Sequence, residues 1–303
     1  MSKSEGLPGD VLARLREADP EDIPAQVPSV WGLLGPFHEK IGYAAPATDR
    51  DRAYGDHPRH RLDVHYDAGR SGAPVLAFVH GGGFTGGDKH QPGTPVYDFV
   101  GAWAVRNGYV GVNITYRLAP AHTWPAGAQD VAAAVDWVRG NIAAYGGSPS
   151  KIVVAGHSAG AVHVASYLAG QGGDAGLAGI RGGALLSGIY DLAEEYRSEL
   201  EHVYYGSHPA AEVSTLPALV ASAVPLLFGI AELDPRPFHL QAAGVVSAWL
   251  ATCGRTPNLA WSQGHNHISA IASLGVDEDA LGVHLARFIA AVTEGSQAAN
   301  APS

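Results

Sequence analysis

The stretch KIVVAGHSAGAVHVASYLAG, residues 151–170, decides the fold of this chain. A short β-branched run ends at Gly156, the segment GHSAG (156–160) fits the pattern G-x-S-x-G, and a helix-compatible run follows at once. Glycines two positions before and after a serine allow a sharp turn from strand to helix, because side chains there would collide with neighbouring backbone. Such a turn lifts Ser158 Oγ above the edge of a sheet, so Ser158 is predicted to be a nucleophile.

Strands and helices alternate on both sides of this turn. Three segments carry apolar side chains at helical spacing, which predicts helices that pack against a core. Several of the predicted strands are continuously apolar, as strands buried on both faces are. We therefore predict an α/β fold with a mostly parallel central sheet and helices on both faces. The predicted strands are 61–66, 74–80, 109–115, 151–156, 182–188, 225–231 and 258–263.

Two further residues complete a candidate catalytic group. A serine is a poor nucleophile until a base takes its proton, and that base needs a third group to orient it. The strand-final carboxylates downstream are Glu232 and Asp234, and the loop after the next strand offers His265 and His267. Each candidate follows a predicted strand, at the carboxyl edge where open α/β sheets bind their ligands.

A glycine-rich loop, FVHGGGFTGGDKH (78–90), allows two interpretations. Gly81, Gly83 and Gly86 fit the G-x-G-x-x-G spacing of dinucleotide sites. The flanking sequence argues against a dinucleotide site. Prolines after the loop prevent a helix from starting there, so no helix N-terminus could bind a pyrophosphate. Residues 100–108 also contain no acidic residue that could bind a ribose. The other interpretation is an oxyanion hole beside Ser158, and we predict no bound cofactor.

Five motifs together resemble the α/β-hydrolase superfamily, and within it the hormone-sensitive-lipase-like carboxylesterases, close to the arylformamidase-like branch. They are HGGGF (80–84), YRLAP (116–120), GHSAG (156–160), ELDP (232–235) and GHNHIS (264–269), and the resemblance covers roughly residues 50–293.

The resemblance implies a role for each matching residue. Ser158 would be the nucleophile, His267 the general base and acid, and Asp234 the carboxylate that orients it. The oxyanion hole would be formed by three backbone N–H groups, those of Gly82, Gly83 and Ala159.

Alternatives remain at two of these positions. The His-hydrophobic-small pattern favours His267, and His265 is then expected to be a surface histidine without a catalytic role. Arg-Pro-Phe at 236–238 departs from the family pattern after the aspartate, which keeps Glu232 as a rival of Asp234. A His-x-His metal site lacks a third ligand nearby, so no metal is predicted.

The resemblance also implies a domain organisation. Residues 1–45 would form an N-terminal lid, which its prolines divide into short helices and loops, and an insertion at about 190–220 would contribute to that lid. Residues 46–293 would form the catalytic α/β-hydrolase domain, and residues 294–303 a flexible tail.

The predicted activity is hydrolysis of carboxylic esters with small to medium acyl groups, through an acyl-enzyme, in the EC 3.1.1 class. The alternatives are an arylformamidase-like amidase that uses the same triad, and a non-catalytic ligand-binding protein on the hydrolase scaffold. The expected partner is a small-molecule ester.

Composition excludes several other classes of protein. A net charge of −10 without a run of Lys or Arg argues against nucleic-acid binding. The single cysteine, Cys253, excludes an intrachain disulfide. No apolar stretch is long enough to span a membrane and no signal peptide is recognisable, so a cytoplasmic protein is expected. The oligomeric state stays open, with a homodimer as one alternative.

Overall fold

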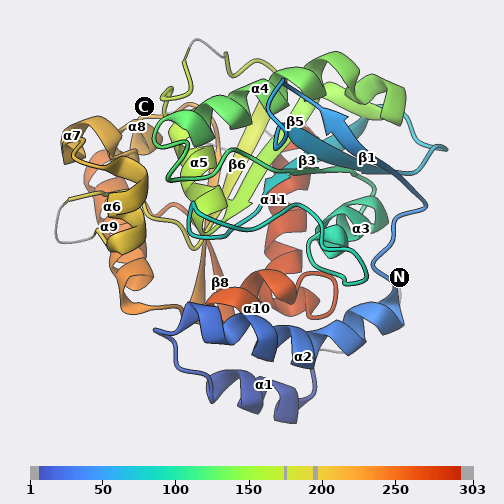
Figure 1. Cartoon of the computed structure of the whole chain (residues 1–303), viewed down its shortest axis with the longest axis horizontal. Helices are drawn as coiled ribbons and strands as arrows, with labels where there is room; N and C mark the ends of the chain where they lie inside the picture. Colours follow the sequence, from blue (N-terminus) through green and yellow to red (C-terminus); the bar gives the residue numbers. More distant parts are fainter. Residues whose placement is uncertain (1–6, 174–175, 194–196, 295–303) are drawn as a thin grey trace.

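The computed structural model describes residues 7–173, 176–193 and 197–294 (Figure 1). Within these ranges, none of the helices combines the length and the apolar character that a membrane crossing requires. In chain order the elements are α1 (Gly9–Arg16), α2 (Ile23–Ile41), β1 (Ala47–Ala53), β2 (Arg61–Tyr66), β3 (Ala73–Val79), α3 (Asp98–Arg106), β4 (Val110–Ile114), α4 (Ala126–Asn141), η1 (Ile142–Tyr145), β5 (Gly147–His157), α5 (Ala159–Leu168), β6 (Ile180–Leu186), α6 (Glu199–Tyr205), α7 (Ala210–Val213), α8 (Leu216–Val220), β7 (Leu226–Leu233), α9 (Arg236–Cys253), β8 (Asn258–Asn266), α10 (His267–Ala272), η3 (Glu278–Gly282) and α11 (Val283–Thr293).

The strands of the described residues form one eight-stranded sheet in the order β1-β2-β4-β3-β5-β6-β7-β8. β1 pairs antiparallel with β2, and β2 pairs antiparallel with β4. From β4 to β8 every neighbouring pair is parallel. The predicted mostly parallel sheet is confirmed, and its parallel strands bring their carboxyl ends to one edge.

Helices cover both faces of this sheet (Figure 1). Successive side chains of a strand point to opposite faces, and β3 shows the result. Val75, Ala77 and Val79 belong to the core shared with α4, α5 and α9. Leu76 and Phe78 belong to the core shared with α3 and α11. A strand buried on both faces reads as continuously apolar, which is why the sequence predicted these strands.

The edge strand β1 (Ala47–Ala53) was not predicted. Its sequence, ATDRDRA, carries four charged residues and no apolar alternation. Ion pairs take the place of apolar burial here. The Arg50 guanidinium lies 2.8 Å from a carboxylate oxygen of Asp63 on β2 and 2.7 Å from one of Asp98 on α3.

The N-terminal segment differs from the expected short helices. α2 is a single helix of 19 residues that continues through Pro28 and Pro36. Each proline removes a helical hydrogen bond, but one face of α2 buries Val30 and Leu34 completely in a core shared with α10. This burial stabilises the helix despite the prolines. The lid assigned to residues 1–45 stays a prediction, and the tail assigned to 294–303 lies outside the described residues from 295 onward.

Two buried histidines occupy the space where helical glycines lack a side chain. A Cβ atom on Gly101 of α3 would lie 2.2 Å from the His65 ring, and one on Gly127 of α4 would lie 2.1 Å from the His163 ring. Glycine inside a helix costs about 1 kcal/mol relative to alanine. The close approach of each histidine ring explains why glycine stands there.

Five buried histidines make stability depend on pH. Burial lowers the pKa of three of them to about 4 and of the other two to about 3, whereas an unfolded histidine titrates near 6.5. Between these values the unfolded chain binds more protons than the folded one, so acid favours unfolding. The first three are His38, His65 and His80, and the other two are His157 and His163.

We therefore expect the free energy of unfolding to fall as the pH decreases from about 6.5 towards 4. Urea denaturation at pH 7.5, 6.5, 5.5 and 5.0 measures this dependence. His163→Phe should show a shallower dependence, by up to about 1.4 kcal/mol per pH unit, because it removes one such group. Equal stability at pH 6.5 and 5.0 would contradict this expectation.

Candidate active site

Ser158 lies at the sharp turn between β5 and α5. Its backbone has φ 56° and ψ −126°, outside the regions that residues with a side chain usually occupy. A Cβ atom on Gly160 would lie 2.1 Å from the carbonyl oxygen of Val79, and one on Gly156 would lie 2.3 Å from that of Gly160. Only glycine fits at both positions, as the sequence predicted, and Ser158 is held in a strained conformation.

The carboxyl ends of β7 and β8 bring Asp234 and His267 together. Leu233 pairs with Asn266 in the parallel ladder, so the two residues that follow leave the sheet side by side. His267 Nδ1 lies 2.6 Å from Asp234 Oδ1, and both side chains are completely buried. An ionised carboxylate can only accept, so His267 donates from Nδ1, which leaves Nε2 as the ring nitrogen that faces away from Asp234.

Three donors hold the Asp234 carboxylate. Besides His267, the Ser187 hydroxyl and the Ala231 N–H each donate to Asp234 Oδ2 over 2.7 Å. Burial by itself would raise the pKa of the Asp234 carboxyl, but these hydrogen bonds and the nearby His267 ring outweigh it and lower the pKa below its ordinary value. Asp234 is therefore a carboxylate at neutral pH.

Ser187 is a site residue that sequence reasoning missed. It directly follows β6 and has a left-handed backbone, with φ 48°. The available signal was its position, because a polar residue just after a central parallel strand lies at the ligand-binding edge of the sheet. The sequence did not show which groups would hold the Asp234 carboxylate in place, and in the structure Ser187 and Ala231 do so through hydrogen bonds.

Glu232, the rival carboxylate, makes other contacts. Its Oε2 accepts a hydrogen bond of 2.6 Å from the Gly264 N–H and lies 3.6 Å from the Arg16 guanidinium of α1. The side chain is 34% exposed. Of the two carboxylates, Asp234 is the one that contacts His267.

The expected surface position of His265 is wrong. Its ring is completely buried, with Nδ1 3.1 Å from Ser269 Oγ and Nε2 3.4 Å from Asp277 Oδ2. Both ring nitrogens have partners, which makes burial of this polar ring affordable. These contacts point to a structural role.

His267 is the first residue of α10, and its position is fixed at the helix start. The Asn266 side chain caps the helix by accepting a hydrogen bond of 2.9 Å from the Ser269 N–H. Its amide also donates to the Leu15 carbonyl of α1 over 3.3 Å. Among the described residues, the buried Nε2 atom of His267 has no hydrogen-bond partner. The structure therefore brings His267 into contact with Asp234 but shows no hydrogen bond between His267 Nε2 and Ser158 Oγ.

The glycine loop turns back on itself through conformations that favour glycine. Gly82 has φ 142° and Gly83 has φ 57°, and the Gly82 carbonyl accepts a hydrogen bond of 3.0 Å from the Gly86 N–H. A Cβ atom on Gly82 would lie 2.2 Å from the Gly86 carbonyl oxygen. The next helix, α3, begins only at Asp98, so no helix N-terminus follows the loop directly, unlike in a dinucleotide site.

This loop lies beside the serine. A Cβ atom on Gly81 would lie 3.2 Å from Ser158 Cβ. In the part of the chain that the structure describes, the backbone N–H groups of Gly82, Gly83 and Ala159 donate to no other group. Unoccupied donors beside a nucleophile can bind a developing oxyanion.

Helix α6, inside the predicted insertion, packs over the glycine loop. A Cβ atom on Gly83 would lie 2.8 Å from Leu200 Cδ1. The Phe84 ring stacks on Tyr204 with their centroids 4.6 Å apart. An apolar cluster that includes Phe84 and Ala159 continues under this helix through Ile189. The surroundings of Ser158 on this side are apolar.

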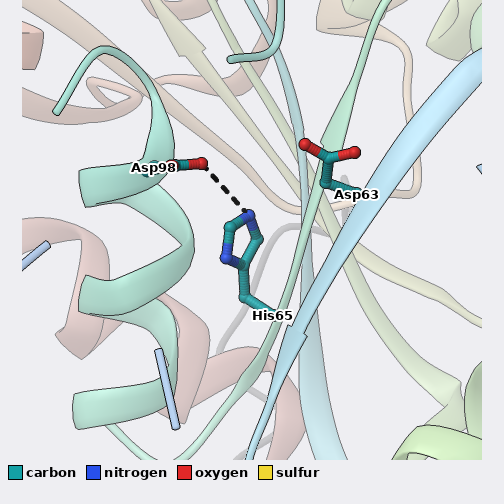
Figure 2. A group of neighbouring side chains, drawn as sticks. All are labelled: Asp63, His65 and Asp98. Carbon is teal, nitrogen blue, oxygen red and sulfur yellow. Dashed lines mark ion pairs between the residues drawn. The ribbon is translucent and has the colours of Figure 1, made fainter. Parts of the chain in front are cut away.

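A second group of side chains has the composition of a metal site. Asp63, His65 and Asp98 place ligand-type atoms within 4.8 Å of one another, and Figure 2 shows them projecting from β2 and α3 toward one another. Two cations already occupy this group, since Arg50 binds both carboxylates and Lys89 Nζ lies 2.9 Å from Asp63 Oδ1. The group is better explained as a buried ion-pair network than as a metal site.

This architecture is the α/β-hydrolase fold. Esterase B from Lactobacillus rhamnosis superposes with a TM-score of 0.71 at 16% identity, covering 92% of this chain and 98% of that one. The hyperthermophilic esterase from the archaeon Pyrobaculum calidifontis superposes with a TM-score of 0.69 at 21% identity, covering 97% and 100%. The predicted fold class is confirmed.

Sequence comparisons find a family and curated relatives. Residues 62–185, which hold the glycine loop and Ser158, match the model of the BD-FAE family. Esterase LipC of Mycobacterium tuberculosis is 41% identical over 139 residues, 45% of this chain and 32% of its own length. Carboxylesterase NlhH of the same species is 46% identical over 93 residues, 30% of this chain and 27% of its own length. The matches span about a third of the curated relatives, and the predicted resemblance to α/β-hydrolase esterases is confirmed.

Proposed function

We propose that this protein is a serine hydrolase of the EC 3.1.1 class that cleaves carboxylic esters through an acyl-enzyme. The observation that carries this proposal is the 2.6 Å hydrogen bond from His267 to Asp234, together with a serine whose backbone is strained at φ 56° and whose neighbour His157 contacts the His267 ring. A base oriented by a buried carboxylate beside a raised serine is the arrangement that activates a hydroxyl.

In the first half of the reaction, Ser158 Oγ attacks the ester carbonyl carbon while His267 Nε2 takes its proton. The tetrahedral intermediate then collapses, and His267 returns that proton to the departing alcohol. Ser158 is left acylated. In the second half, water attacks the acyl carbon, His267 takes a proton from the water and passes it to Ser158, and the carboxylic acid leaves. Asp234 stabilises the imidazolium in both halves.

The proposed oxyanion hole consists of the N–H groups of Gly82, Gly83 and Ala159. Each donor would contribute roughly 3 kcal/mol to the transition state, because it binds the oxygen only as charge develops. The Ala159 N–H also opens helix α5, whose N-terminus favours negative charge. These three N–H groups donate to no other group among the described residues, which supports this assignment.

The acyl group is proposed to be small to medium in size. The apolar cluster beside Ala159 suits an aliphatic chain, and Leu200 on α6 lies over Gly83. We propose that the insertion at about 190–220 acts as a lid on this side. The cytoplasmic location and the homodimer stay predictions.

Turnover of p-nitrophenyl esters of increasing acyl length, with formyl-anilides in parallel, tests this proposal. We expect kcat/KM to be greatest for short and medium acyl chains and to exceed formyl-anilide turnover at least tenfold. Faster formyl-anilide cleavage would instead support the amidase. No turnover together with no labelling by a fluorophosphonate probe would mean that the scaffold binds without catalysis.

A further inference from the structure

His157, the residue directly before Ser158, contacts the proposed base through its ring and through a hydrogen bond. Its ring centroid lies 4.8 Å from that of His267. Its Nε2 lies 2.9 Å from the backbone oxygen of His267. A carbonyl oxygen can only accept, so His157 donates from Nε2. From the sequence alone, the second position of G-x-S-x-G has no assigned part in the chemistry.

The protonation state of His157 follows from this contact. With the hydrogen on Nε2, the neutral ring carries its lone pair on Nδ1, which is buried and has no partner among the described residues. Burial and the neighbouring His267 ring lower the pKa of His157 to about 3. His157 therefore stays neutral at ordinary pH and adds no positive charge beside an imidazolium at His267.

Two restraints from different strands hold His267. Asp234, after β7, fixes the Nδ1 side of the ring, whereas His157, at the end of β5, fixes the main chain. His157 is covalently bonded to Ser158. Its hydrogen bond to the His267 carbonyl therefore connects the proposed base directly to the turn that carries the proposed nucleophile. A displacement of about 1 Å between reacting groups can cost about 100-fold in rate.

We propose that His157 is a positioning residue: the hydrogen bond from its Nε2 to the His267 carbonyl holds His267 where its Nε2 can take the proton of Ser158 Oγ during the reaction. The inference rests on the proposed serine-hydrolase function. The proposal gives His157, the second residue of the G-x-S-x-G segment, a part in the reaction, because His157 positions His267 in addition to packing against it.

A matched pair of variants tests it. His157→Phe keeps an aromatic ring against His267 and removes the donor, whereas His157→Gln replaces the ring and keeps an N–H donor at a similar reach. We expect kcat for p-nitrophenyl butyrate to fall about 10- to 100-fold in His157→Phe with KM within twofold, and to recover to within a few-fold of wild type in His157→Gln. Thermal unfolding of both variants checks that they are equally folded.

Wild-type kcat in His157→Phe, or an equal loss in both folded variants, would overturn the proposal and leave His157 a packing residue. If His157→Phe does not fold, His157→Asn replaces it, since its shorter amide cannot reach the His267 carbonyl. Fluorophosphonate labelling of wild-type Ser158 distinguishes a failure of the proposed function from a failure of the proposed role of His157. Without labelling the proposed function itself fails, whereas labelling with unchanged kcat in His157→Phe rejects only the role of His157.

Discussion

Replacing Ser158 with alanine is expected to reduce the hydrolysis of p-nitrophenyl acetate by about 10⁴-fold or more. The variant lacks the attacking oxygen, so neither His267 nor Asp234 has a proton transfer to assist. A small rate above that in water should remain, because the proposed oxyanion donors are untouched. Initial rates at saturating substrate measure the effect.

The control for this variant is its fold. Alanine fits wherever serine fits, so the urea denaturation curve of Ser158→Ala should stay close to that of wild type. A folded Ser158→Ala protein that turns over substrate at the wild-type rate would exclude Ser158 as the nucleophile.

Replacing Asp234 with asparagine is expected to lower kcat by about 10⁴-fold, with a much smaller change in KM. The amide no longer stabilises the imidazolium, and its NH₂ group can hold the His267 ring in the wrong tautomer. Steady-state kinetics with p-nitrophenyl butyrate measures both constants.

Glu232→Gln is the matched control, because it makes the same chemical change two residues away. Glu232 is partly exposed and contacts Gly264 and Arg16, so its kcat should stay within about threefold of wild type, as for a surface ion pair. The reverse result, a large loss in Glu232→Gln and a small one in Asp234→Asn, would assign the orienting role to Glu232.

The interior of the sheet was predictable because its strands are buried on both faces. Their runs of apolar side chains stand out against the surroundings, and the position of Ser158 follows from the glycines around it. Asp234 and His267 could be named for a related reason. Parallel strands end at one edge, so polar residues just after them are brought together.

What could not be predicted depends on contacts between distant parts of the chain. β1 is stabilised by ion pairs from Arg50 to Asp63 and Asp98. A local sequence pattern does not predict partners that lie this far away in the sequence. Ser187 reaches Asp234 across 47 positions of sequence. The burial of His265 depends on Asp277, which returns to it only after α10.

The close packing of helical glycines against buried histidines has a consequence for how this family of folds varies. Alanine at position 101 would collide with His65, but beside a smaller residue at 65 the same alanine would gain helix propensity. The sign of the substitution therefore depends on its partner, and the same coupling links position 127 to His163. Positions 65 and 101, and positions 127 and 163, should accordingly change together in evolution, and engineering should treat each pair as a single unit.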